Sequence, residues 1–159
     1  IAKMLVTNTC LHTLRLANNN IEDKGVVEIA KSLVINDCLH TLDLSNNDFG
    51  DMGAMEIAKT LAINNCLDIL YLDDNNIGGK GAIEIAKSLA NNTCLHTLQM
   101  KYCVIKEQDL IEIAKELESN YTLREINLEP LSGEKIKEII DRNNSIFENK
   151  RFVRTKPAS

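Results

Sequence analysis

The chain has 159 residues, is 44% hydrophobic and 26% charged, and carries a formal net charge of −5. This length and composition fit a single globular unit, and the mild negative charge argues against nucleic acid as a partner. The sequence has no apolar run near the roughly 20 residues of a membrane-spanning helix, and no recognisable signal peptide. We therefore expect a cytoplasmic protein that does not bind membranes.

The first residues, Ile1–Leu5, repeat the pattern of Ile29–Leu33, so the chain begins within a predicted helix. A terminal repeat normally presents a polar outer face. Ile1–Leu5 offers no such face, and we expect further residues upstream that belong to a longer protein.

A motif of seven residues, Cys-Leu-His-Thr-Leu-Xaa-Leu, follows and returns every 28 residues. Its copies, of which the last three are variants, occupy Cys10–Leu16, Cys38–Leu44, Cys66–Leu72, Cys94–Met100 and Thr122–Leu128. The alternation of leucines with other residues, as at Leu14 and Leu16, predicts a short strand in each copy. A fixed period in this range indicates stacked structural units.

An asparagine follows each of the first three predicted strands, at Asn19, Asn47 and Asn75. Its amide can bond to backbone groups that a turning chain leaves unpaired. Cys103 takes this place in the fourth copy, and Pro130 breaks the pattern after the fifth.

The second half of each copy has the spacing of a helix with one apolar face. In the first full copy this face consists of Val26, Ile29, Ala30 and Leu33. The opposite face carries the pairs Glu28 and Lys31, Glu56 and Lys59, Glu84 and Lys87, and Glu112 and Lys115. An asparagine follows each helix, and we expect it to end the helix in a left-handed conformation. These asparagines are Asn36, Asn64, Asn92 and Asn120.

Stacking of such units brings strands roughly 4.8 Å apart and helices about 10 Å apart, so the stack curves with its strands on the concave side. The motif resembles leucine-rich repeats, and the long period with a full helix resembles the ribonuclease-inhibitor-like subclass. That subclass includes the repeat regions of NOD-like receptors and Ran GTPase-activating proteins, and the C-terminal domain of tropomodulins. The resemblance implies an α/β fold, a horseshoe-shaped solenoid with parallel strands on the concave face and helices on the convex face.

We expect residues 1–131 to contain about five strand rungs, the first of them truncated, and residues 132–159 to form a shortened repeat and cap. A helix is predicted through Ile136 and Ile139, and the residues at 143–146 echo the post-helix pattern at 120–123. Phe147, Phe152 and Val153 are expected to cover the open end of the core. Lys150, Arg151, Arg154 and Lys156 form a basic tail, which we interpret as a solvated end.

Cysteine and histidine also recur in rows. The odd cysteine count and the absence of an export signal favour reduced thiols, and the simplest interpretation of the row is a small buried apolar residue. These residues are Cys10, Cys38, Cys66 and Cys94, with His12, His40 and His96 two positions later. A zinc site is disfavoured because Asp68 interrupts the histidines and the short paired spacing of zinc ligands is missing. We predict no metal, no cofactor and no catalytic residues.

The outward strand positions vary from copy to copy while the core is nearly invariant, and this contrast is the sequence signal for function. We predict a partner-binding site on the concave face, composed of Asp43, Tyr71, Asp73, Asp74, Gln99, Lys101 and Tyr102. Tyrosines are enriched among residues that dominate binding energy, and the acidic surround suits a partner protein with a basic surface. Drift of a solvated face is the competing explanation.

The predicted function is a monomeric, non-catalytic protein-interaction scaffold. Three alternatives stay open: a sensor or autoinhibitory segment of a NOD-like-receptor-type protein, a tropomodulin-like actin-binding domain, and a GTPase activator. No motif allows the functional residues of Ran GTPase-activating proteins to be placed on this sequence.

Overall fold

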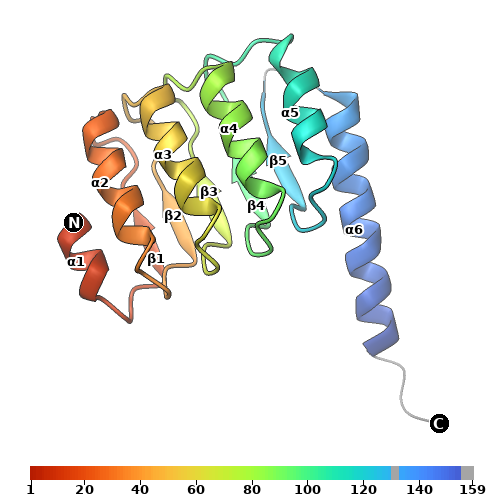
Figure 1. The fold of residues 1–159 in the computed structure, drawn as a ribbon, viewed down its shortest axis with the longest axis horizontal. Coiled ribbons are helices and arrows are strands. Elements are labelled where there is room, and N and C mark those ends of the chain that lie inside the picture. Colours follow the sequence, from red (N-terminus) through yellow and green to blue (C-terminus); the bar gives the residue numbers. More distant parts are fainter. Residues whose placement is uncertain (130–132, 155–159) are drawn as a thin grey trace.

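A computed structural model describes residues 1–129 and 133–154, with side chains to residue 148. Figure 1 shows a row of helices packed over a row of short strands, with the two termini at opposite ends of the stack. The strands are β1 (Thr13–Arg15), β2 (Thr41–Asp43), β3 (Ile69–Tyr71), β4 (Thr97–Gln99) and β5 (Glu125–Asn127). The helices are α1 (Ala2–Thr7), α2 (Asp23–Leu33), α3 (Asp51–Leu61), α4 (Gly79–Leu89), α5 (Asp109–Leu117) and α6 (Glu134–Arg154). The predicted α/β solenoid is confirmed.

The strands form one parallel sheet in the order β1-β2-β3-β4-β5. Residues that share a position in the repeat are paired across it, for example Leu14 with Leu42 and Leu42 with Leu70. Leu42, Leu70 and Leu98 point into the core and are at most 1% exposed. Their neighbours on either side therefore point to the concave face, because successive strand side chains alternate.

The predicted helix faces form the other half of the core. Ile57, Ile85 and Ile113 lie against the strand layer and are at most 4% exposed. On the outer face the pairs Glu28–Lys31, Glu56–Lys59 and Glu84–Lys87 form ion pairs, whereas Glu112 and Lys115 form none among the described residues. None of the helices in the described ranges is long and apolar enough to cross a membrane.

The turn asparagines behave as predicted. The Asn47 Nδ2 donates to the carbonyl oxygens of Leu44 at 3.0 Å in its own rung and of Leu16 at 3.0 Å in the preceding rung. Its Oδ1 accepts the backbone N–H groups of Asn19 and Ile21 from the preceding rung, at 3.1 and 2.8 Å. This side chain therefore joins two rungs as well as closing one turn.

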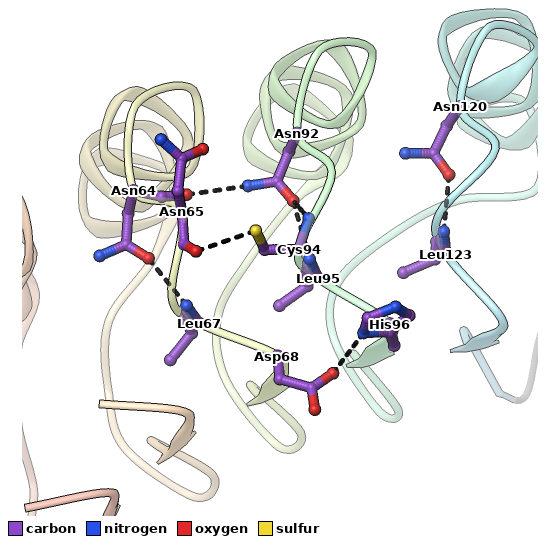
Figure 2. A network of polar contacts seen from close by, with 10 residues as sticks. All are labelled: Asn64, Asn65, Leu67, Asp68, Asn92, Cys94, Leu95, His96, Asn120 and Leu123. Atoms are coloured by element: carbon purple, nitrogen blue, oxygen red, sulfur yellow. Dashed lines mark hydrogen bonds and ion pairs between the residues drawn. The ribbon is translucent and has the colours of Figure 1, made fainter. Parts of the chain in front are cut away.

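The prediction for the post-helix asparagines is wrong. None of Asn36, Asn64, Asn92 and Asn120 has a positive φ, and all four are buried. Figure 2 shows their actual role, in which the Asn64 Oδ1 accepts from the N–H of Leu67 at 2.8 Å. The Asn64 Nδ2 donates to Leu33, the last residue of α2, at 2.8 Å. The final carbonyl groups of a helix lack partners within it, so each asparagine satisfies the helix of the rung before its own.

The C-terminal end also differs from the prediction. The expected boundary near residue 131 lies outside the described residues. Beyond it α6 continues without a break to Arg154, so residues 143–146 lie inside a helix and not in a post-helix turn. Asn143 is nevertheless buried and donates from Nδ2 to the Leu123 carbonyl at 2.7 Å, which fastens α6 to the last rung.

Ile136 and Ile139, each 4% exposed, cover the end of the core. Phe147 does not cover it, because its ring is 36% exposed and lies under the Arg124 guanidinium at 3.5 Å. The side chains of Phe152, Val153 and the predicted basic tail lie outside the described residues.

Candidate functional site

Part of the predicted site is assembled by strand register. Asp43 is paired with Tyr71, and Tyr71 with Gln99, on three successive strands. Adjacent strands lie about 4.8 Å apart, so these residues form a continuous row on the concave face. Asp43 and Tyr71 are partly exposed, and Asp43 also accepts the backbone N–H of Ser45 on its Oδ1 at 3.0 Å.

Gln99 does not offer the surface that the sequence predicted. Its side chain lies on the concave row but the residue is only 7% exposed. The Nε2 donates to Glu125 Oε1 at 2.7 Å on the neighbouring strand. Gln99 therefore orients an acidic neighbour and is not itself available to a partner.

Asp73 and Lys101 lie two residues beyond the ends of β3 and β4, on adjacent rungs. The backbone N–H of Lys101 donates to Asp73 Oδ1 at 2.7 Å, and the Lys101 Nζ lies 3.7 Å from Glu129 Oε2 on the next rung. Partial burial raises the pKa of the Asp73 carboxyl, and the bond from Lys101 and its charge oppose that rise. The negative charges of Asp74 and Asp43 raise it further.

Asp74 and Tyr102 are not on the strands but in the turns that follow them. Asp74 has φ 52° and Tyr102 has φ 55°, both in the left-handed region. Each turn is held by the next rung, since the N–H of Asp74 donates to Lys101 O and that of Tyr102 to Glu129 O, both at 2.8 Å. Tyr102 is 60% exposed, so its ring is available to a partner.

The cysteine row is less buried than expected. Cys38 is buried, but Cys66 and Cys94 are partly exposed and Cys10 is exposed. The thiols of Cys38, Cys66 and Cys94 donate to carbonyl groups of the preceding repeat. Figure 2 shows this for Cys94, whose Sγ lies 2.9 Å from Asn65 O. All five cysteines are free thiols.

The histidine row is divided between two arrangements. The rings of His12 and His40 lie with their centroids 5.3 Å apart and their planes tilted by 39°, whereas His96 Nδ1 lies 2.6 Å from Asp68 Oδ1. In the part of the chain that the structure describes, no group of three or more His, Cys, Asp and Glu side chains is arranged to hold a metal ion.

One residue of interest was missed by sequence reasoning. Val104 lies two positions after Tyr102 and is 57% exposed. A comparison of the turns between copies could have found it, because Asn20, Asp48 and Asn76 occupy the same place in the preceding rungs.

Comparison with known proteins agrees with the repeat pattern. A family model described as "Leucine Rich repeat" matches residues 7–30, 36–58 and 64–86, which are three successive copies. No curated protein sequence matches the chain.

Two solved structures are similar over nearly the whole chain. One is the actin-binding site 2 of leiomodin-1, with 25% identity, a TM-score of 0.87, and coverage of 96% of this chain and 92% of that one. The other is the C-terminal domain of tropomodulin from Caenorhabditis elegans, with 14% identity, a TM-score of 0.84, and coverage of 95% of each chain. The second likeness concerns the fold alone, given its low identity.

Proposed function

Because the chain is a leucine-rich-repeat protein, we propose that it is a non-catalytic scaffold that binds a partner protein on the concave face of its sheet. The concave site comprises Asp43, Tyr71, Asp73, Asp74, Lys101 and Tyr102. The partner presents a basic surface, and the scaffold acts as a monomer in the cytoplasm.

The observation that carries this proposal is the contrast between two sets of residues in the same strands. The inward strand residues are almost identical from rung to rung, and those of the three middle strands, Leu42, Leu70 and Leu98, are buried. The outward row changes at every step, from Arg15 through Asp43 and Tyr71 to Gln99 and Asn127, although register places these residues side by side. A variable row that includes an acidic residue, Asp43, and an aromatic one, Tyr71, suits recognition of one particular protein surface.

A more specific candidate for the partner is actin. The solved structure that resembles this chain at 25% identity is an actin-binding site, and the similarity extends through the C-terminal helix because it covers 96% of the chain. The net charge of −5 and the acidic concave site make a basic patch on the partner the expected contact.

Co-sedimentation with actin filaments and a fluorescence assay of filament elongation test this candidate. We expect the unmutated chain to bind actin and to slow elongation, and the double variant Tyr71→Ala/Tyr102→Ala to lose both effects while unfolding cooperatively. Tyr121→Ala is the matched control, because Tyr121 has the same 60% exposure as Tyr102 but lies outside the concave site.

The outcomes separate two levels of the proposal. A chain that neither binds actin nor slows elongation excludes actin as the partner. Retention of actin by a folded Tyr71→Ala/Tyr102→Ala variant would show that the concave site is wrongly placed.

A further inference from the structure

The turn after β4 has a different chemistry from the turns after the first three strands. Those three turns carry only Asn and Asp at three successive positions, namely Asn18-Asn19-Asn20, Asn46-Asn47-Asp48 and Asp74-Asn75-Asn76. The fourth carries Tyr102-Cys103-Val104. Three polar residues are thus replaced together by less polar ones in a single rung.

The backbone of the fourth turn has nevertheless kept the path of the others. Tyr102 has φ 55°, close to the 61°, 49° and 52° of Asn18, Asn46 and Asp74. The Val104 N–H donates to Ile77 O at 2.8 Å, which ties the turn to the preceding rung. Left-handed φ is tolerated by Asn and Asp but is a strained conformation for a bulky residue such as tyrosine.

The replacement of asparagine by Cys103 also removes hydrogen bonds, both within the turn and to the preceding rung. Asn75 donates from Nδ2 to three carbonyl oxygens, those of Leu44, Leu72 and Asp73, at 3.0 to 3.1 Å. The Cys103 Sγ makes one weak contact of this kind, to Leu72 O at 3.5 Å. Burial raises the pKa of the Cys103 thiol to about 11, so the thiol stays neutral and contributes no charged interaction.

The strained turn places two large, weakly polar side chains in solvent. Tyr102 is 60% exposed and Val104 is 57% exposed. Neither side chain enters the core, and the replacement of asparagine by Cys103 weakens the hydrogen bonding to the preceding rung. These residues therefore do not serve to stabilise the fold. Local violations of folding rules without a compensating gain are expected at functional positions.

The surroundings of this turn are acidic. Asp74 precedes Tyr102 by one repeat and is exposed, and Asp73 lies beside it. On the other side Glu129 Oε2 lies 3.7 Å from the Nζ of Lys101, which offsets its charge. A partner whose apolar group packs on this turn is therefore exposed to the negative charges of Asp73 and Asp74.

We propose that Tyr102 and Val104, which we call the rung-4 corner, are the anchor point for a protein segment that carries an aromatic or aliphatic side chain beside one or two basic residues. The apolar side chain packs on Tyr102 and Val104, and the basic residues face Asp73 and Asp74. This inference rests on the proposed function and deepens it, because it moves the centre of the concave site to a turn and adds Val104.

The first test compares stability. The variant Tyr102→Asn/Cys103→Asn/Val104→Asp gives this turn the sequence of the second rung, Asn46-Asn47-Asp48. We expect its urea midpoint to be higher than that of the unmutated chain, because strain is relieved and the asparagine bonds return. A lower midpoint would mean that the native turn is a structural optimum, which contradicts the inference.

The second test measures binding with a probe that does not depend on knowing the partner. Random twelve-residue peptides displayed on phage are selected on the unmutated chain and counterselected on the triple variant. Enriched peptides are expected to combine an aromatic or aliphatic residue with Lys or Arg. As free peptides they should bind the triple variant at least ten times more weakly. Val104→Asn alone leaves Tyr102, the residue with positive φ, unchanged and should lower the affinity of these peptides several-fold. Tyr121→Asn should leave their affinity unchanged.

Failure of this inference is distinguishable from failure of the proposed function. Peptides that bind the chain and the triple variant equally, or the absence of any enriched peptide, would overturn the rung-4 corner. If the triple variant binds actin as well as the unmutated chain does, the rung-4 corner is not part of the binding site, and the proposal of a concave scaffold still stands. Loss of actin as a candidate, together with peptides of the expected chemistry, would retain the corner for another basic partner.

Discussion

At the level of single residues, the asparagines that follow the helices each bond to several backbone groups at once. Asn64 receives the N–H groups of Cys66 and Leu67 on its Oδ1, and its Nδ2 donates to Leu33 O and Asn36 O. One side chain thus satisfies four backbone groups of two rungs. An unpaired buried backbone group costs about 1–3 kcal/mol, so few substitutions can be tolerated here.

We expect Asn64→Ala to lower the free energy of unfolding by about 3 kcal/mol or more, because several of these backbone groups lose their partner without access to water. Urea denaturation measures the change. Asn65→Ala is the control, since Asn65 is exposed and contributes only its backbone carbonyl to the thiol of Cys94. Equal stability of the two variants would show that the hydrogen bonds of Asn64 add nothing beyond those of a surface residue.

The raised pKa of the Asp73 carboxyl predicts that the stability of the folded chain depends on pH. Its pKa in the folded chain is raised, chiefly by partial burial, so the folded state holds this proton more tightly than the unfolded state does. Stability contributed by this group therefore falls as pH rises through the window between the ordinary carboxyl value of about 3.9 and the higher folded value. Below that window both states are protonated, and above it both are ionised.

Asp73→Asn removes this dependence while keeping an oxygen that can accept the Lys101 N–H. We expect the variant to be slightly more stable than the unmutated chain at neutral pH. This advantage should shrink as the pH is lowered through the carboxyl range. Thermal melts of both proteins between pH 4 and 7 measure it, and an advantage that grows toward low pH would mean that the pKa of Asp73 is lowered in the folded state.

At the level of elements, the starts of α3 and α4 are each held by the helix before them. Asp23 in α2 accepts the N–H groups of Gly50 and Gly53 at 3.0 and 2.7 Å, and Asp51 in α3 accepts those of Gly78 and Gly81, both at 2.9 Å. A carboxylate is favourable at a helix N-terminus because the first N–H groups have no partner within the helix.

The next rung exchanges the two residue types. Gly79 stands where Asp23 and Asp51 stand in the earlier copies, and Asp109 stands where Gly53 and Gly81 stand. Asp109 accepts the N–H of Lys106, in the segment that precedes its own helix, at 2.9 Å. A Cβ atom on Gly79 would lie 2.2 Å from the Asp109 carboxyl carbon, so a larger residue at position 79 would displace the Asp109 side chain.

We expect Gly79→Ala to destabilise the chain by about 1–3 kcal/mol through overpacking. The double variant Gly79→Asp/Asp109→Gly should recover most of that loss, because it restores the arrangement of the earlier rungs. Gly50→Ala is the control, since the nearest atom to its added Cβ is 3.4 Å away. A double variant less stable than Gly79→Ala would show that the two positions are not exchangeable.

Much of this architecture was predictable because it depends on periodicity. Strand register, the buried leucines and the helix faces follow from residues such as Leu42 and Ile57 recurring at a fixed step. Gln99 and Asn64 were misassigned because their roles depend on hydrogen bonds between rungs, which the spacing within one copy does not reveal. The length of α6 was missed since Asn143, which looks like a helix terminator in sequence, bonds from inside the helix to Leu123.

At the level of the whole molecule, the main contacts between elements of the described residues join neighbouring rungs. Strands pair only with adjacent strands, and each helix packs mainly on its neighbours. In such a solenoid stability is close to a sum of rung terms and nearest-neighbour interfaces. The position of a defect along the stack therefore matters as much as its chemistry.

Leu72→Asp places an unpaired carboxylate at a site with 0% exposure in the third of five rungs. We expect the free energy of unfolding to fall by about 4 kcal/mol, because neither water nor a partner compensates for the buried charge. Since the damage lies on both the β2–β3 and the β3–β4 interfaces, hydrogen exchange should accelerate in rungs on either side. The two halves should also melt less cooperatively.

Leu16→Asp provides the matched comparison, because Leu16 holds the same repeat position in the first rung and is 8% exposed. Its faster exchange should be confined to α1, β1 and α2, with the rungs from β3 onward protected as in the unmutated chain. If Leu72→Asp melts like the unmutated chain, the assigned register of the core is wrong. If Leu16→Asp unprotects every rung equally, the stack is a single cooperative unit and the nearest-neighbour description fails.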